Sequence, residues 1–160
     1  MADKKTNCTT EEAAKEYFRQ GFNCCESVFR AFLDTHDTGL PADAACISTG
    51  FGGGVGSSKT EICGAVSAAE MSLGTVIGRR GDADLGDKDK NIEYLHTLYP
   101  EFEKMLSELR EELGSARCAD LTADYGDFHS LERRRHCKDI VAACAKKADE
   151  FAAAHEMPEK

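Results

Sequence analysis

The chain has 160 residues, 41% of them hydrophobic and 31% charged, and its formal net charge at pH 7 is -9. This length predicts one domain over residues 1–160, with flexible ends at 1–9 and 156–160. The acidic balance argues against a nucleic-acid partner, because affinity for phosphates depends on Lys and Arg. No apolar run is long enough for a membrane span and no secretory signal is recognisable, so we expect a cytoplasmic protein.

The first helical pattern begins at Thr9, a residue type favoured at helix N-caps, and its apolar face continues to Phe32. One helix is therefore predicted, with Cys24 and Cys25 pointing inward. The polar run 34–39 ends it, and Pro41 opens a short helix through Cys46.

A glycine-rich loop follows at 50–56. Its glycines permit left-handed backbone angles and the close approach of another group to the main chain. It matches neither a dinucleotide-binding loop nor a Walker loop, because no strand precedes it and Ser57-Ser58-Lys59 follows it.

Three further helices are expected. The first covers about 60–78 with Cys63 in its first turn, and a charged surface loop at 79–89 follows it. The next runs over about 90–113, with a kink or a fresh start at Pro100, and the last over about 132–155, with Cys137 near its beginning.

Between the last two, Ser115 caps a short helix that holds Cys118 near its start. No strand pattern of period two persists anywhere. The fold class predicted is therefore all-α, a compact bundle of about five to six helices with a glycine-rich loop.

Eight cysteines are the outstanding feature of the composition. Structural disulfides are rare in cytosolic proteins, which favours a metal, cluster or redox role, although free cysteines also serve as small buried hydrophobes. Cys63, Cys118 and Cys137 lie at or near predicted helix starts, where the pKa of a thiol is lowered, and Cys24 joins them from an apolar helix face. Their separations of 39, 55 and 19 residues exclude a zinc ribbon or a bacterial ferredoxin motif.

A resemblance to a family rests on five segments, 21–24, 52–54, 63–65, 118–121 and 137–141. They resemble the redox-active proteins named C_GCAxxG_C_C over about residues 14–152, and the four cysteines of that family fall on Cys24, Cys63, Cys118 and Cys137. The resemblance implies that these four bind a cofactor, an iron–sulfur cluster, because the similar non-haem part of split-Soret cytochromes carries one. This chain has Ala68 where the family's element has glycine.

The remaining cysteines match no family position, and we interpret them as packing or spare thiols, with Cys25 the first candidate for an exception. They are Cys8, Cys25, Cys46 and Cys144.

The leading hypothesis is a one-electron carrier or redox sensor with a [2Fe–2S] or [4Fe–4S] cluster, working with a redox partner protein. Whether the chain is an oxidoreductase enzyme or an electron carrier stays open, and no catalytic residue is assigned. One alternative is a metal-free thiol–disulfide protein that uses the same cysteines. Another is a zinc-stabilised structural or docking module. Glycine- and alanine-rich helix faces are compatible with a homodimer.

The other titratable residues are interpreted as structural. Glu70 is expected to be exposed or paired along its helix, and His129 and His136 to lie at the surface. The basic run 133–136 is expected to be a solvated helix entry that also tunes a neighbouring thiolate.

Overall fold

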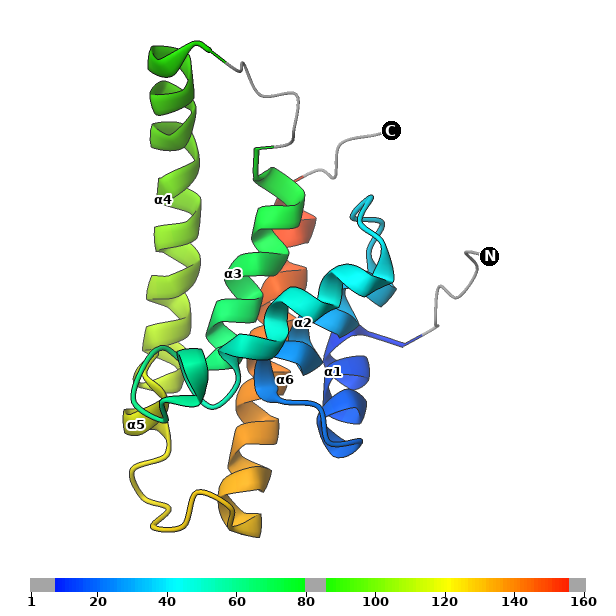
Figure 1. Ribbon diagram of the computed structural model, residues 1–160, viewed down its shortest axis with the longest axis vertical. Coiled ribbons are helices and arrows are strands. Elements are labelled where there is room, and N and C mark those ends of the chain that lie inside the picture. The colour runs from blue at the N-terminus through cyan, green and yellow to red at the C-terminus, as the bar shows by residue number, and fades with distance from the viewer. Residues whose placement is uncertain (1–7, 80–85, 156–160) are drawn as a thin grey trace.

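The described part of the chain folds into helices. The computed structural model describes residues 8–79 and 86–155, and this part contains no β-strand. Its α-helices are α1 (Thr10–Arg19), α2 (Cys24–Thr35), α3 (Gly64–Ile77), α4 (Lys88–Leu113), α5 (Cys118–Leu121) and α6 (Leu131–Ala154). Two 3₁₀ segments, η1 (Ala42–Phe51) and η2 (Val55–Ser57), lie between α2 and α3. The predicted compact all-α bundle is confirmed (Figure 1).

The amino-terminal helical pattern forms two helices, so the single helix predicted there is wrong. Gly21 adopts φ of 102°, and Asn23 caps α2. The Asn23 side chain accepts a hydrogen bond from the Glu26 N–H at 2.9 Å, and the Glu26 carboxylate accepts one from the Asn23 N–H at 3.0 Å. This reciprocal cap provides a helix start inside the apolar pattern. Cys24 therefore begins a helix instead of lying within one.

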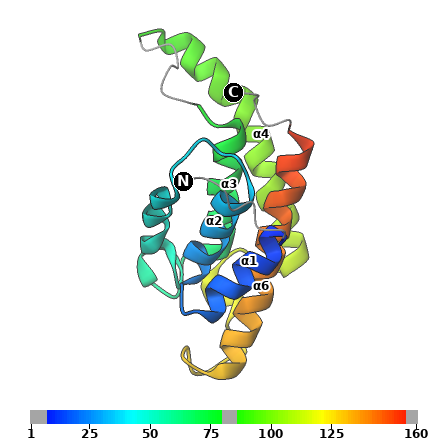
Figure 2. The same cartoon turned by 90° about the vertical axis from the view of Figure 1, so that its right-hand side faces the viewer.

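α3 lies at the centre of the bundle and packs against α2, α4 and α6 (Figures 1 and 2). It is buried over most of its length because its residues are small or apolar on nearly every side. Burial of one large apolar side chain stabilises a fold by about 1.5–3 kcal/mol. The largest fully buried side chains in this core include Phe29, Phe32, Leu73, Met105 and Leu109.

α4 extends beyond the rest of the bundle (Figure 1). Its carboxyl-terminal half packs inward through Met105 and Leu109, whereas Ile92 and Tyr99 in the other half are 41% and 56% exposed. The helix is continuous through Pro100, so the alternative of a fresh helix start there is wrong. Proline's fixed φ is compatible with a helix, although one backbone hydrogen bond is lost.

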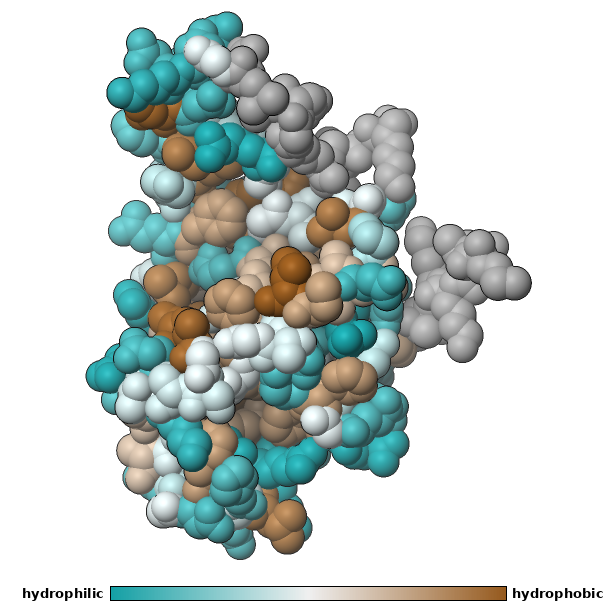
Figure 3. Space-filling model, viewed as in Figure 1, coloured by the Kyte–Doolittle hydropathy of each residue, from teal (hydrophilic) through white to brown (hydrophobic). Residues whose placement is uncertain are grey.

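Apolar residues gather near the middle of the face seen in Figure 3. Leu40, just before η1, and Ile47, within it, are 43% and 57% exposed. Together with Phe29 and Met71 they line a cavity of about 490 Å³ between η1 and α3. No residue that lines this cavity is a cysteine.

Some predicted segments fall outside the described residues. These are most of the loop at 79–89 and most of the flexible ends at 1–9 and 156–160. Among the helices that are described, none combines the length and the apolar character needed to cross a membrane.

Candidate functional site

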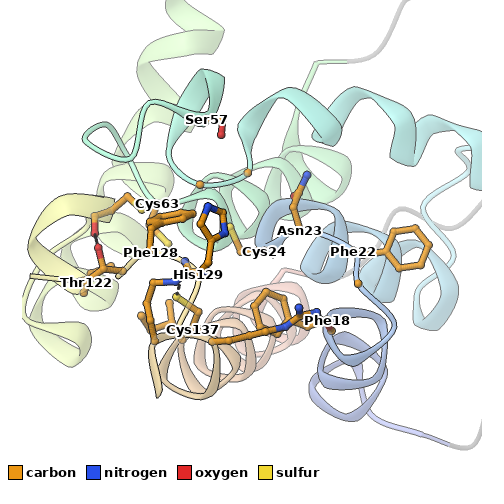
Figure 4. A pocket seen from close by; sticks show the side chains of 18 of the residues that line it. Phe18, Phe22, Asn23, Cys24, Ser57, Cys63, Thr122, Phe128, His129 and Cys137 are labelled. Atoms are coloured by element: carbon orange, nitrogen blue, oxygen red, sulfur yellow. Dashed lines mark hydrogen bonds between the residues drawn. The ribbon is translucent and has the colours of Figure 1, made fainter. Parts of the chain in front are cut away.

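Cys24, Cys63, Cys118 and Cys137 line one cavity of about 450 Å³. They come from α2, from the residue before α3, from α5 and from α6, and the fold brings all four together. Figure 4 labels three of them, Cys24, Cys63 and Cys137, among the side chains that line this cavity. Their role as ligands of a cofactor stays a prediction. Other lining residues include Phe18, Asn23, Phe128, His129, Arg133 and Arg134.

A short main-chain pairing holds Cys63 next to Cys118. Ile62 and Arg117 form an isolated antiparallel bridge. On either side of it the Cys63 N–H donates to the Ala116 carbonyl and the Cys118 N–H donates to a carbonyl before the bridge, each at 2.8 Å. Backbone bonds therefore join two segments that are 55 residues apart in the sequence.

Cys137 is positioned by contacts of α6 with α5 and α1. The His136 Nε2 lies 2.8 Å from the Leu121 carbonyl oxygen, and its ring stacks on Tyr125 with centroids 5.1 Å apart. The Arg134 guanidinium donates to the Phe18 carbonyl at 3.2 Å. These contacts fix the first turns of α6 against the cavity.

Glycine allows close approach at two places around the site. A Cβ atom on Gly64 would lie 2.6 Å from the Cys24 Sγ and 2.5 Å from the Phe51 carbonyl oxygen. A Cβ atom on Gly54, where φ is 75°, would lie 3.3 Å from the Cys118 Cβ. The close approach predicted for the glycine-rich loop is therefore confirmed.

Cys24 has the most polar surroundings of the four cysteines. It begins α2 and Cys63 is the N-cap of α3, so two helix amino termini meet at its sulfur. That sulfur accepts hydrogen bonds from the Cys63 thiol and from the amide N–H groups of Gly53, Cys25 and Ala65. These bonds outweigh burial and lower the pKa of Cys24 to about 6. The charged form of Cys24 is therefore favoured relative to that of an ordinary thiol.

The other three cysteines have raised pKa values, so the prediction that helix starts lower them is wrong. The pKa of Cys63 is raised because its thiol donates to Cys24 and is buried. Burial raises the pKa of Cys118, and it raises the pKa of Cys137 to about 11, although Arg133 acts in the opposite direction on both. The bond to Cys24 at Cys63 and burial at Cys118 outweigh the helix termini there, and Cys137 lies two turns beyond the start of α6.

Arg133 contributes a charge to the cavity and lies one helical turn before Cys137. Its Nη1 lies 3.6 Å from the Cys137 Sγ, and its guanidinium carbon lies 3.8 Å from the centre of the Phe128 ring. The predicted solvated helix entry is wrong for Arg133, which is half-buried. The predicted effect on a neighbouring cysteine is present, because Arg133 opposes the rise that burial causes in the pKa of Cys137. The i, i+4 spacing of Arg133 and Cys137 could have predicted this contact from the sequence. No sequence pattern indicated that Phe128 lies at the site.

The cysteines outside the family positions do not contribute side chains to the cavity. Cys25 and Cys144 are 0% exposed, Cys46 is exposed and Cys8 is half-buried. None of the four lines the cavity, and neither does Ala68, which is fully buried in the core.

Glu70 is half-buried and does not line the cavity. Its Oε1 is buried without a hydrogen-bond partner, so the prediction of an exposed or helix-paired carboxylate is wrong. Burial raises the pKa of Glu70 to about 7. His129 is exposed at the cavity, as predicted for the surface, whereas His136 is half-buried.

The donor set fits a multinuclear group better than a single ion. Over residues 8–79 and 86–155, no three His, Cys, Asp or Glu side chains are arranged to hold one metal ion. Thiolates are the ligands that iron–sulfur clusters take, and amide N–H groups directed at a ligand sulfur are typical of such sites. Four cysteines and several amides around one partly apolar cavity meet these requirements.

A family model matches residues 22–151, and its description is "Putative redox-active protein (C_GCAxxG_C_C)". Comparison with curated proteins and with solved structures gives no match. The matched region contains all four cysteines of the cavity and ends within α6.

Proposed function

Since the chain belongs to the C_GCAxxG_C_C family, whose members are described as redox-active, we propose that it binds an iron–sulfur cluster, [2Fe–2S] or [4Fe–4S], for electron transfer or redox sensing. The ligands are Cys24, Cys63, Cys118 and Cys137. The observation that carries this proposal is that four cysteines from four distant segments line one cavity. When bound, the cluster supplies a one-electron redox couple.

The residues of this chain have separate tasks in the proposed site. Cys24 is the ligand whose negative charge the fold favours most, because its hydrogen bonds stabilise the thiolate form. The other three bind as thiolates after they lose their protons, so assembly of the site releases protons. Phe18 and Phe128 line the cavity and reduce the access of water to it.

The test is reconstitution without oxygen, followed by iron and sulfide assays and by absorption and paramagnetic resonance spectra. We expect the unaltered chain to take up iron and sulfide and to show a spectrum that changes on reduction. Cys24→Ser, Cys63→Ser, Cys118→Ser and Cys137→Ser should each lose most of the cluster. Cys46→Ser is the matched control, because Cys46 is exposed and does not line the cavity.

A colourless, iron-free protein after reconstitution would contradict the proposal. Stoichiometric zinc without any potential-dependent absorbance would instead support a zinc-stabilised module.

A second candidate function is a metal-free thiol–disulfide pair formed by Cys24 and Cys63. It is favoured by the hydrogen bond from the Cys63 thiol to the Cys24 thiolate. The Cys24 thiolate would attack a substrate disulfide and release one thiolate. Cys63, after losing its proton, would then attack the Cys24 sulfur, closing the internal disulfide and releasing the second thiolate.

Alkylation before and after a reductant separates the two candidates. A Cys24–Cys63 disulfide that forms reversibly in the metal-free protein would change the alkylated mass by two labels. Labelling that does not depend on the reductant argues against this second function.

A further inference from the structure

Arg133 is a positive charge at the cavity without a carboxylate partner. Within the described residues it forms no ion pair with Asp or Glu. Its Nε is buried and has no hydrogen-bond partner. Its contacts at the cavity are the Cys137 Sγ, 3.6 Å from Nη1, and the Phe128 ring, 3.8 Å from the guanidinium carbon.

The neighbouring arginines are different. Arg134 donates to the Phe18 carbonyl, and Arg135 is exposed and does not line the cavity. A guanidinium keeps its charge at every pH that the fold tolerates. A charge that is partly withdrawn from water is stabilised by a compensating charge or by hydrogen bonds, and around Arg133 the structure offers sulfur and an aromatic face.

We propose that Arg133 is the fixed counter-charge for negative charge held on the cysteines in this cavity, and that it sets the reduction potential of the bound group. This inference rests on the proposed iron–sulfur function. A cluster bound by four thiolates is anionic and gains one more negative charge when it takes up an electron. A positive charge next to a ligand sulfur stabilises the reduced form more than the oxidised form. Arg133 therefore acts through Cys137 as a positioning residue and raises the potential.

The competing explanation is a purely structural role, in which the guanidinium stacks on Phe128 and holds the loop before α6. A lysine substitution distinguishes the two roles, because it can replace the charge of Arg133 but not its stacking on Phe128. A lysine at position 133 keeps the charge but loses the planar stack, whereas a glutamine keeps a polar side chain and loses the charge.

The experiment compares Arg133→Gln, Arg133→Lys and the control Arg135→Gln, which removes the same charge two residues along the helix at an exposed position. The first readout is a redox titration of the reconstituted proteins. For Arg133→Gln we expect about a tenfold lower ratio of reduced to oxidised cluster at a fixed potential, which is about 59 mV for a one-electron couple. Arg133→Lys and Arg135→Gln should stay within about threefold of the unaltered chain.

The second readout needs no cluster. In the metal-free proteins, modification of Cys137 by iodoacetamide at one fixed pH should slow several-fold in Arg133→Gln and recover in Arg133→Lys. Peptide mass spectrometry follows Cys137 alone. Circular dichroism compares the helix content of all variants.

Each outcome decides the proposal. An unchanged ratio in Arg133→Gln, or an equal shift in Arg135→Gln, overturns it. If the unaltered chain takes up no cluster, the proposed function fails and the alkylation rates decide the role of Arg133 without it. If Arg133→Gln does not fold, Arg133→Lys decides, because a tenfold shift despite the retained charge would show that charge is not the cause.

Discussion

At the scale of single residues, hydrogen bonding and burial determine the direction in which the pKa of each cysteine is shifted. Cys24, Cys63 and Cys118 lie at helix starts and Cys137 lies two turns into α6, yet only Cys24 has a lowered pKa. The Cys24 sulfur accepts hydrogen bonds from a thiol and from several amide N–H groups, whereas the Cys63 thiol donates its hydrogen bond to Cys24. Proximity to a helix terminus is therefore a weaker influence than the direct partners of the sulfur.

Gly64 gives a prediction at this scale, because the Cys24 sulfur and a backbone carbonyl occupy the space of a side chain there. We expect Gly64→Ala to lower the free energy of unfolding by about 1–3 kcal/mol, since the Phe51 carbonyl cannot move independently of η1. The same variant should lose cluster incorporation, because the Cys24 sulfur is displaced. Urea denaturation and iron analysis measure the two effects.

Gly74, in the same helix, is the matched control, because nothing lies within 4 Å of a Cβ atom built there. Gly74→Ala should raise the free energy of unfolding by about 0.5–1 kcal/mol through the lower backbone entropy of the unfolded chain. Equal effects of the two substitutions would contradict the packing argument at Gly64.

At the scale of elements, helix boundaries followed local caps more closely than apolar periodicity. The pattern from Thr10 to Phe32 reads as one helix, but Gly21 and the reciprocal cap of Asn23 and Glu26 divide it. In α4, by contrast, an interruption was expected at the proline and the helix continues through it. A cap supplies hydrogen bonds to free N–H groups, whereas a proline removes only one bond from a long helix.

The proline in α4 gives a prediction for this element. Pro100 is exposed and interior to the helix, so Pro100→Ala restores a backbone donor at a position where no packing is disturbed. The free energy of unfolding should rise by about 1–3 kcal/mol. Glu103→Ala, at an exposed position one turn later, is the comparison and should change it by less than about 0.5 kcal/mol. Loss of stability in Pro100→Ala would show that α4 needs the proline.

At the scale of the whole molecule, the central helix α3 connects the core to the site. Its buried length packs against α2 and α6, and Cys63, its N-cap, lines the cavity. The same burial leaves Glu70 with a carboxylate oxygen that has no partner. The protonation of Glu70 in this central helix therefore makes the free energy of unfolding depend on pH.

Glu70 gives the prediction at this scale. Its folded pKa of about 7 is above the ordinary value of 4.5, so the protonated form stabilises the fold. This contribution is fully present below pH 4.5 and is lost as the pH rises through 7. Glu70→Gln should raise the free energy of unfolding at pH 8 by about 1–3 kcal/mol and leave it nearly unchanged at pH 4. Urea denaturation at the two pH values measures this, and a constant difference between them would contradict the burial of the charge.

The sequence by itself determined the helical fold class, because apolar spacing near 3.6 residues is a local property. The family motif likewise identified Cys24, Cys63, Cys118 and Cys137 as the residues to follow. Only the tertiary structure decided that these four share one cavity and that Arg133 lies against one of them. Convergence depends on contacts such as the Ile62–Arg117 bridge, which join segments far apart in the chain and leave no local pattern.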